Sequence, residues 1–254
     1  MIQVSAPRFR SIQRTRLLRR LLLHHLVLFA LATISVGAIF ITRPYRDVWM
    51  KASFATAYPA LFLLLATLVL GPFNILTGRR NPVSSDVRRD IGIWAGILGI
   101  LHTAVGQNVH LRGRPWLYYV YEHRSRHLLP FRHDLFGLSN YTGLICTLLI
   151  ILLLATSNDY ALRRLGTRNW KTLQRWNYAA FALLAVHALG YESIEHQKAH
   201  FVITTIAVLG ITLLTQASAF LLLRTKVASR TAADQLKREV TTDREILDPN
   251  GGRV

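Results

Sequence analysis

Six apolar segments, each close to the thickness of a lipid bilayer, constrain the possible folds of this chain more than any other feature. They run from Leu21 to Thr42, Ala52 to Leu76, Ile91 to Leu111, Leu138 to Thr156, Leu173 to Tyr191 and Ala199 to Leu223. A helix rises about 1.5 Å per residue and the hydrocarbon core is about 30 Å thick. We therefore predict an all-α membrane protein, a six-transmembrane-helix bundle, with kinks at Pro59 and Pro72 in the second helix.

The charge of the chain supports a lipid environment. Only 17% of residues are charged and 51% are hydrophobic, yet the formal net charge is +18. The basic residues lie in short runs between the apolar segments, where they can contact lipid phosphates. Nucleic acid is disfavoured as a partner, because a soluble nucleic-acid binder does not need six segments of this length. The expected partner is the lipid bilayer.

The distribution of lysine and arginine predicts the orientation. The N-terminal tail, the loop 77–90, the connection 158–175 and the C-terminal tail carry 22 of the 31 basic residues. By the positive-inside rule these parts face the cytoplasm, so both termini lie on the cytoplasmic side and the third and fifth helices run outward. We expect a multi-pass integral protein of the bacterial inner membrane or of an organellar, thylakoid-like membrane.

Three regions follow from this pattern. Residues 1–20 form a basic cytoplasmic N-tail that resembles the start of a signal peptide, but the apolar stretch after it has the length of a span and is expected to be retained. Residues 21–223 form the six-helix membrane domain. Residues 224–254 form a polar cytoplasmic C-tail, expected to extend the last helix and then become partly disordered.

Two histidines, His102 and His187, lie deep inside the third and fifth apolar segments. An ionisable side chain at this depth costs about 2.5 kcal/mol or more when charged, so it predicts a functional site. Cys146 is the only cysteine, which excludes an iron–sulfur or zinc cluster held by this chain alone. Two neutral imidazoles on parallel helices suggest an axial haem pair, and an interhelical hydrogen bond for each histidine is the alternative.

Small residues surround His102. Gly99 and Gly106 share its helical face, and they either open room for a flat macrocycle or let two helices approach closely. Helical rise from the expected outer ends places His102 about 13 Å and His187 about 6 Å deep, so both favour the outer half of the membrane. The difference of about 7 Å is within the error of such boundaries.

The stretches 88–102 and 154–191 resemble the ferric reductase-like transmembrane domain family, above all in the motif Asn-Trp-Lys-Thr-Leu-Gln-Arg-Trp-Asn-Tyr that precedes His187. This family includes NADPH oxidases, metalloreductases and the haem subunit of the periplasmic methionine sulfoxide reductase system. The resemblance implies a haem b between the third and fifth helices, with His102 and His187 as metal ligands. It also implies that electrons pass outward across the membrane.

The chain departs from the family pattern at the second haem. Members with two haems have a histidine thirteen residues before the one matched by His187, and here that position is Gln174. The positions after His102 where its partner is expected hold Pro115 and Trp116. We therefore expect one haem. Only about thirty polar residues follow the last helix, so we expect a separate flavin reductase, a quinol or another membrane redox partner as donor, with a quinone as a possible second cofactor.

The leading hypothesis is a membrane b-type cytochrome that relays electrons through a single bis-histidine haem to an acceptor at the outer side. Such a protein is a haem-containing oxidoreductase subunit that needs a separate electron donor. The alternative is a non-catalytic accessory or assembly subunit of a larger membrane complex, which kept the bundle without redox turnover.

Other polar residues have competing interpretations. Arg112 and Arg114 are expected near the haem propionates, together with His110, whose helical phase disfavours direct ligation. The remaining histidines of the outer side have two interpretations: they belong to a hydrated loop, or they form an outer metal or quinone site. These histidines are His123, His127, His133, His196 and His200. His24 and His25 are expected to pair with lipid phosphate.

Overall fold

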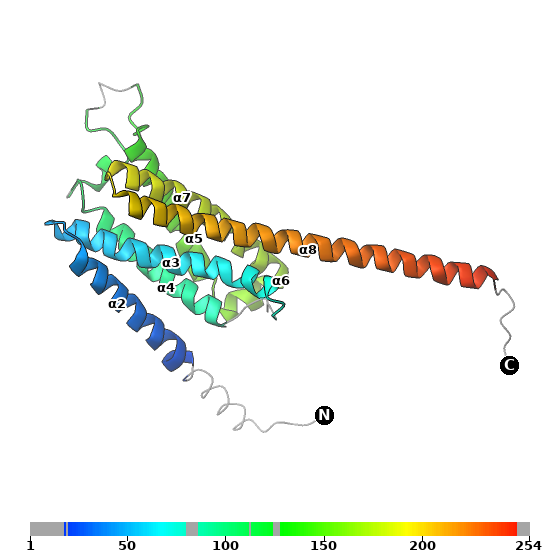
Figure 1. Cartoon of the computed structure of the whole chain (residues 1–254). Helices are drawn as coiled ribbons and strands as arrows, with labels where there is room; N and C mark the ends of the chain where they lie inside the picture. The colour runs from blue at the N-terminus through cyan, green and yellow to red at the C-terminus, as the bar shows by residue number, and fades with distance from the viewer. Residues whose placement is uncertain (1–17, 19, 80–85, 112, 124–127, 248–254) are drawn as a thin grey trace.

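The computed structural model describes residues 18, 20–79, 86–111, 113–123 and 128–247, and this part of the chain is all-α (Figure 1). The elements in chain order are the π-helix η1 (Leu21–Leu26), α2 (Val27–Thr42), α3 (Val48–Leu76), α4 (Asp86–Gly106), the 3-10 turn η2 (Pro115–Tyr118), α5 (Leu135–Ala155), α6 (Asp159–Gln174), α7 (Trp176–Ile194) and α8 (Ala199–Leu247). Within the described ranges, β pairing is confined to the single bridge between Val120 and Phe131. The all-α prediction is confirmed.

Four helices form the centre of the bundle. α3 packs against α4, α5 packs against α7, and α4 and α5 join the two pairs. α2 and α8 pack on α3 from the outside (Figure 1). The largest apolar cluster joins Leu61, Leu65 and Leu68 of α3 to Leu209 of α8. α3 continues through Pro59 and Pro72, which are both buried.

Among the described residues, four helices are long and apolar enough to cross a membrane: η1 with α2 (Leu21–Thr42), α3 (Val48–Leu76), α5 (Leu135–Ala155) and the first part of α8 (Ala199–Gln235). α4 and α7 do not belong to this group. The first turn of α4 holds Asp86 and Asp90 with two arginines between them, and α7 contains His187 and Glu192. Of the four central helices, α4 and α7 are therefore the less apolar pair, and they carry the two predicted ligands.

Several helix bounds differ by a few residues from those expected from the sequence, and the differences in α4 and in the connection 158–175 matter most for the site. α4 ends at Gly106, five residues before the predicted Leu111, because the chain turns there and the buried Tyr118 hydroxyl donates to the carbonyl of Gly106 at 3.0 Å. The connection 158–175 is the helix α6, bent at Gly166, where φ is 73°. As expected for the start of the C-tail, α8 continues without a break beyond residue 223 to Leu247, and it projects from the bundle (Figure 1).

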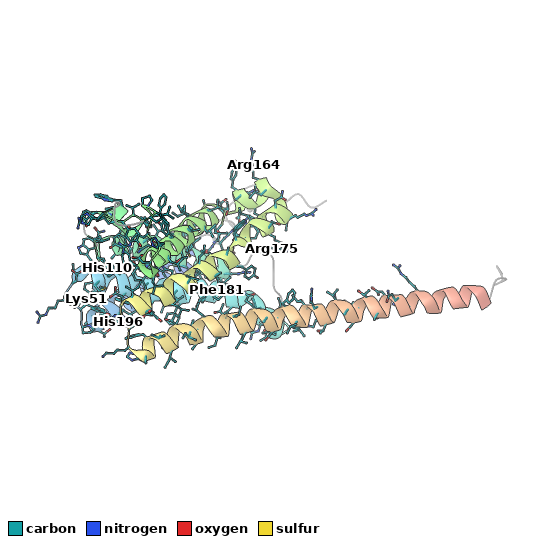
Figure 2. All side chains as sticks on the ribbon, turned by 90° about the horizontal axis from the view of Figure 1, so that it is seen from above. Lys51, His110, Arg164, Arg175, Phe181 and His196 are labelled. Atoms are coloured by element: carbon teal, nitrogen blue, oxygen red, sulfur yellow. The ribbon has the colours of Figure 1, made fainter. Side chains whose placement is uncertain are left out.

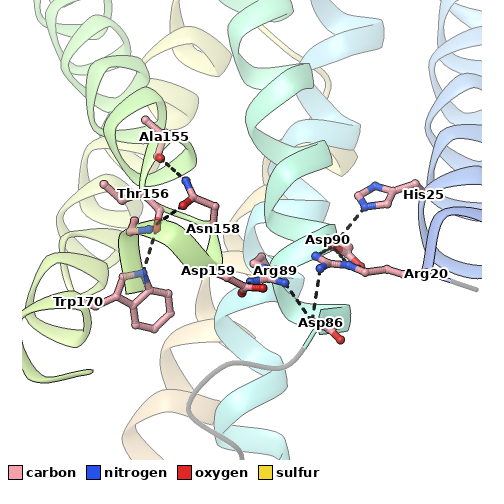
Figure 3. Close-up of polar contacts among 11 residues, drawn as sticks. Arg20, His25, Asp86, Arg89, Asp90, Ala155, Thr156, Asn158, Asp159 and Trp170 are labelled. Atoms are coloured by element: carbon pink, nitrogen blue, oxygen red, sulfur yellow. Dashed lines mark hydrogen bonds and ion pairs between the residues drawn. The ribbon is translucent and has the colours of Figure 1, made fainter. Parts of the chain in front are cut away.

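Buried charge ties the beginning of the chain to α4. The Asp90 carboxylate is fully buried and accepts from Arg20 Nε at 2.9 Å. The ring nitrogens of His24 and His25 lie 2.8 and 3.4 Å from the same carboxylate, and Figure 3 shows His25 and Arg20 meeting Asp90. The expectation that these histidines pair with lipid phosphate is therefore corrected. A buried carboxylate needs charged or hydrogen-bonding partners, and these side chains supply them.

Candidate metal centre

The structure brings the two predicted ligands together. His102 on α4 and His187 on α7 have ring centroids 6.0 Å apart, with an angle of 73° between the ring planes. Both lie nearer to the C-terminal ends of their helices, at Gly106 and Ile194. We call this the histidine end of the bundle, and we call the opposite end, where Arg88, Arg89, Lys171 and Arg175 lie, the basic end. Figure 2 shows the two ends, with His110 and His196 at one and Arg175 at the other.

Each imidazole is oriented by a backbone carbonyl. His102 Nδ1 lies 3.1 Å from the carbonyl oxygen of Ser53 on α3, and His187 Nδ1 lies 2.8 Å from that of Ser139 on α5. A carbonyl oxygen only accepts, so each Nδ1 carries the proton and each Nε2 keeps a free lone pair. Metal-bound histidines show this arrangement, because the second hydrogen bond fixes the tautomer and the ring orientation.

The small residues one turn after these serines explain why their carbonyls are accessible. In a helix the Cβ of a residue tilts toward the preceding turn. Ala57 and Gly143 stand four residues after Ser53 and Ser139, so little side chain covers either carbonyl. Only glycine fits beside the His187 ring at position 143, because an added Cβ would lie 2.5 Å from His187 Nδ1.

The spacing of the rings fits one metal ion between them. An imidazole nitrogen binds a first-row metal at about 2 Å, so two rings on opposite sides of one ion have centroids about 6 Å apart. The observed separation of 6.0 Å matches this value. The distance between the two rings is therefore compatible with one metal ion between them.

A cavity opens beside the two rings, and the predicted glycines line it. Its walls come from α3, α4, α5, α7 and α8, and they include Gly99 and Gly106. An added Cβ would meet its nearest neighbour only at 3.8 Å at Gly99 and at 3.9 Å at Gly106. An added methyl group would therefore make only an ordinary van der Waals contact at either glycine, so neither position is a tight helix contact, and both glycines line the cavity.

The polar groups at the histidine end of the cavity differ from those expected. Arg112 lies outside the described residues, and Arg114 forms an ion pair with Glu122 at 2.6 Å and does not line the cavity. His110 does line it, with Nε2 3.0 Å from Glu195 Oε1. Glu192 also lines the cavity and accepts from Thr205, while its buried Oε2 has no hydrogen-bond partner among the described residues.

The remaining histidines of this end do not gather into a second centre. His127 lies outside the described residues. His133 packs against Tyr121 and His200 against Phe201, with ring centroids 5.3 and 4.1 Å apart. In the described part of the chain, which includes His123 and His196, no group of three or more histidine, cysteine or acidic side chains is placed to hold a metal ion.

Taken together, the apolar helices and the facing imidazoles define a multi-pass membrane protein with a candidate bis-histidine centre. Residues 56–185, about half of the chain, match the family model described as ferric reductase like transmembrane component. The chain belongs to this family, which confirms the resemblance drawn from its sequence. The match contains both candidate ligand helices up to Ala185, and His187 follows two residues later.

The chain is similar to bacterial proteins with an assigned name. The chain is 27% identical over 164 residues to the protein-methionine-sulfoxide reductase heme-binding subunit MsrQ of Yersinia pseudotuberculosis serotype O:1b (strain IP 31758), covering 64% of this chain and 71% of the relative. The proteins of the same name from Yersinia pestis strains Pestoides F and Angola give the same identity and cover 70% of their length. No solved structure matches the chain.

Proposed function

We propose that this protein is a membrane b-type cytochrome that relays electrons through one haem bound by His102 and His187. The observation that carries the proposal is the facing pair of imidazoles, 6.0 Å apart, each with its Nδ1 on a backbone carbonyl. The naming of the relatives as heme-binding subunits supports it. A haem with two imidazole ligands supplies one-electron transfer and leaves no open iron position for a substrate.

The residues around the centre each have a defined task in this proposal. The carbonyls of Ser53 and Ser139 hold the rings in the tautomer that ligates through Nε2 and increase the basicity of that nitrogen. Gly143 leaves room for the His187 ring. Gly99 and Gly106 line the cavity beside His102 and keep this face of α4 free of side chains, so they would leave room for the group.

The residues at the positions where two-haem members of the family have a second pair of histidines favour a single haem. Gln174 stands where two-haem members have a histidine, and its amide Nε2 lies 3.5 Å from Thr156 Oγ1. Pro115 and Trp116 form the start of the turn η2 beyond the histidine end of α4, whereas Gln174 lies at the basic end, so these positions do not face each other. Neither position offers an imidazole, so this chain has the groups for one bis-histidine site.

We further propose that six helices cross the membrane, with α6 lying at the basic end. α4 has 21 residues and α7 has 19, which correspond to about 31 and 28 Å of helix and suffice for the hydrocarbon core. The positive-inside rule places the basic end and both termini in the cytoplasm, so the haem is nearer the outer side and delivers electrons to an outer acceptor. The donor is a separate redox partner, either a flavin reductase, a membrane quinol or another membrane protein.

A vesicle assay tests the relay. The full-length protein is reconstituted into liposomes that enclose ferricyanide, and the impermeant reductant dithionite is added outside. We expect ferricyanide reduction in proportion to the haem-loaded protein, and only the background of empty vesicles with His187→Ala. If the haem-loaded protein moves no electrons, the relay is contradicted and the accessory-subunit alternative is favoured.

A further inference from the structure

A second cavity lies at the basic end, between α3, α4, α5, α6 and α7. It has a volume of about 330 Å³, whereas one water molecule takes about 30 Å³. It adjoins the histidine cavity across Leu64 and Ile150, which line both. Its polar lining is distinct from that of the histidine cavity, and the proposed haem does not use it. We call it the basic pocket.

The lining of the basic pocket carries four cations and no carboxylate: Arg88, Arg89, Lys171 and Arg175. Cations that line a cavity without nearby acids repel each other, so an anion bound among them is stabilised. The carboxylates closest to this group are already engaged, because Asp86 and Asp159 both pair with the terminal nitrogens of Arg89 (Figure 3). Arg89 is therefore already neutralised by these two carboxylates, and the remaining positive charge of the lining lies on Arg88, Lys171 and Arg175.

The four cations differ in how far they are already engaged. The Arg89 side chain is only 10% exposed, and its buried Nε has no hydrogen-bond partner among the described residues. Arg88 lies half-buried and donates from Nε to the carbonyl of Thr67 at 2.8 Å. Lys171 and Arg175 are exposed, and no described carboxylate pairs with either. The pocket thus combines buried donors with accessible charges at its mouth.

The rest of the lining is mixed. It has neutral polar groups from Thr67, Ser157, Gln174, Asn177 and Tyr178, and it has one apolar wall. Leu68 from α3 and Leu153 and Leu154 from α5 form its inner wall. A ligand that matches both the cations and the leucine wall has an anionic group at the basic end and an apolar body that extends into the bundle. Basic pockets between transmembrane helices on the cytoplasmic side bind anionic lipid headgroups in this way.

We propose that the basic pocket binds an anionic phospholipid. Its phosphate lies among Arg88, Lys171 and Arg175, and an acyl chain lies along Leu68 and Leu153. A soluble phosphate ester offers the same headgroup chemistry but cannot cover the apolar wall, so the lipid is the preferred source of the phosphate.

Native mass spectrometry of the full-length protein in detergent tests the proposal. Phosphatidylglycerol is the anionic probe, zwitterionic phosphatidylcholine is the matched neutral lipid, and glycerol phosphate is the soluble phosphate. We expect phosphatidylglycerol to bind at least about five-fold more tightly than phosphatidylcholine, since one basic residue near a lipid surface contributes about that factor. Glycerol phosphate should not compete.

Charge-removing variants locate the site. Lys171→Gln and Arg175→Gln should each weaken phosphatidylglycerol binding about five-fold and leave phosphatidylcholine unchanged. The matched control is Arg164→Gln, which removes the same charge from an exposed position of α6 that does not line the pocket (Figure 2). Both test positions are exposed, so circular dichroism should show unchanged helicity.

Two results would overturn the proposal. An equal loss of binding in Arg164→Gln would assign the lipid to the general positive surface of the protein. Equal affinity for glycerol phosphate and phosphatidylglycerol would assign the pocket to a soluble phosphate ester. Neither result depends on haem content, so the test is independent of the proposed electron relay.

Discussion

The substitution Gly143→Ala tests the construction of the metal centre most sharply without touching a ligand. The new methyl group would lie 2.5 Å from His187 Nδ1 and 2.7 Å from Cε1, while ordinary contacts begin at 3.4 Å. The ring must therefore retreat by about 1 Å, since packed interiors have little free volume. This movement weakens the 2.8 Å hydrogen bond from Nδ1 to the carbonyl of Ser139.

The expected loss follows from these two effects. Overpacking costs about 1 to 3 kcal/mol, and a lost hydrogen bond costs about 1 kcal/mol. The sum of about 2 to 4 kcal/mol corresponds to a thirty- to thousand-fold lower affinity for haem. We would measure this affinity by titrating haem into the haem-depleted protein and following the absorption of the low-spin complex.

The matched control is Gly37→Ala on α2, where an added Cβ meets nothing within 4 Å. We expect this variant to bind haem with the affinity of the unaltered protein. If Gly143→Ala also bound haem with unaltered affinity and an unaltered spectrum, the assigned position of the His187 ring and its role as a ligand would be refuted.

Three further positions give tests of their own. Gly99→Ala should keep the stability within about 1 kcal/mol, because its nearest neighbour would lie 3.8 Å away, but should lower the haem content of the purified protein. Tyr118→Phe should lower the stability by about 1 to 3 kcal/mol in thermal melts, because the buried hydroxyl accepts from the His110 amide at 2.8 Å. The hydrogen bond from Arg89 holds the pKa of Asp159 below its usual 3.8. Its contribution to stability is therefore full above pH 3.8 and is lost as the pH falls through the lowered value, and Asp159→Asn should remove this part of the acid dependence. An unchanged haem content, melting curve or acid profile, respectively, would contradict each expectation.

The two histidines that the structure brings together could be singled out from the sequence because their chemistry contrasts with their surroundings. His102 and His187 stand out in apolar segments, and the glycines beside His102 indicate space on the same helical face. The relative depth of the two histidines in the membrane could not be predicted, because it was counted from helix ends that the sequence does not define. α4 ends five residues before and α7 three residues after the predicted ends, and the end of α4 is fixed by a contact with the distant Tyr118.

The residues that support the ligands were not found from the sequence. Ser53 and Ser139 accept the hydrogen bonds from the imidazoles through their backbone carbonyls. Every residue has such a carbonyl, so no residue type in the sequence marks these two positions. Gly143 resembles any glycine that lets transmembrane helices approach until the position of His187 is known. The helix α6 did leave a signal, since Trp170 is an apolar residue in a basic stretch, and its indole is buried with Nε1 donating to Thr156 at 2.9 Å (Figure 3).

The quantity that tests the central claim most directly is the number of haems per chain, measured together with their optical spectrum. For the purified full-length protein we predict one haem b with the split reduced absorption bands of a low-spin, bis-histidine centre. His102→Ala and His187→Ala should each abolish this spectrum while circular dichroism shows the same helicity. Two haems per chain, or a folded protein that binds none, would contradict the claim of a single haem between these two histidines.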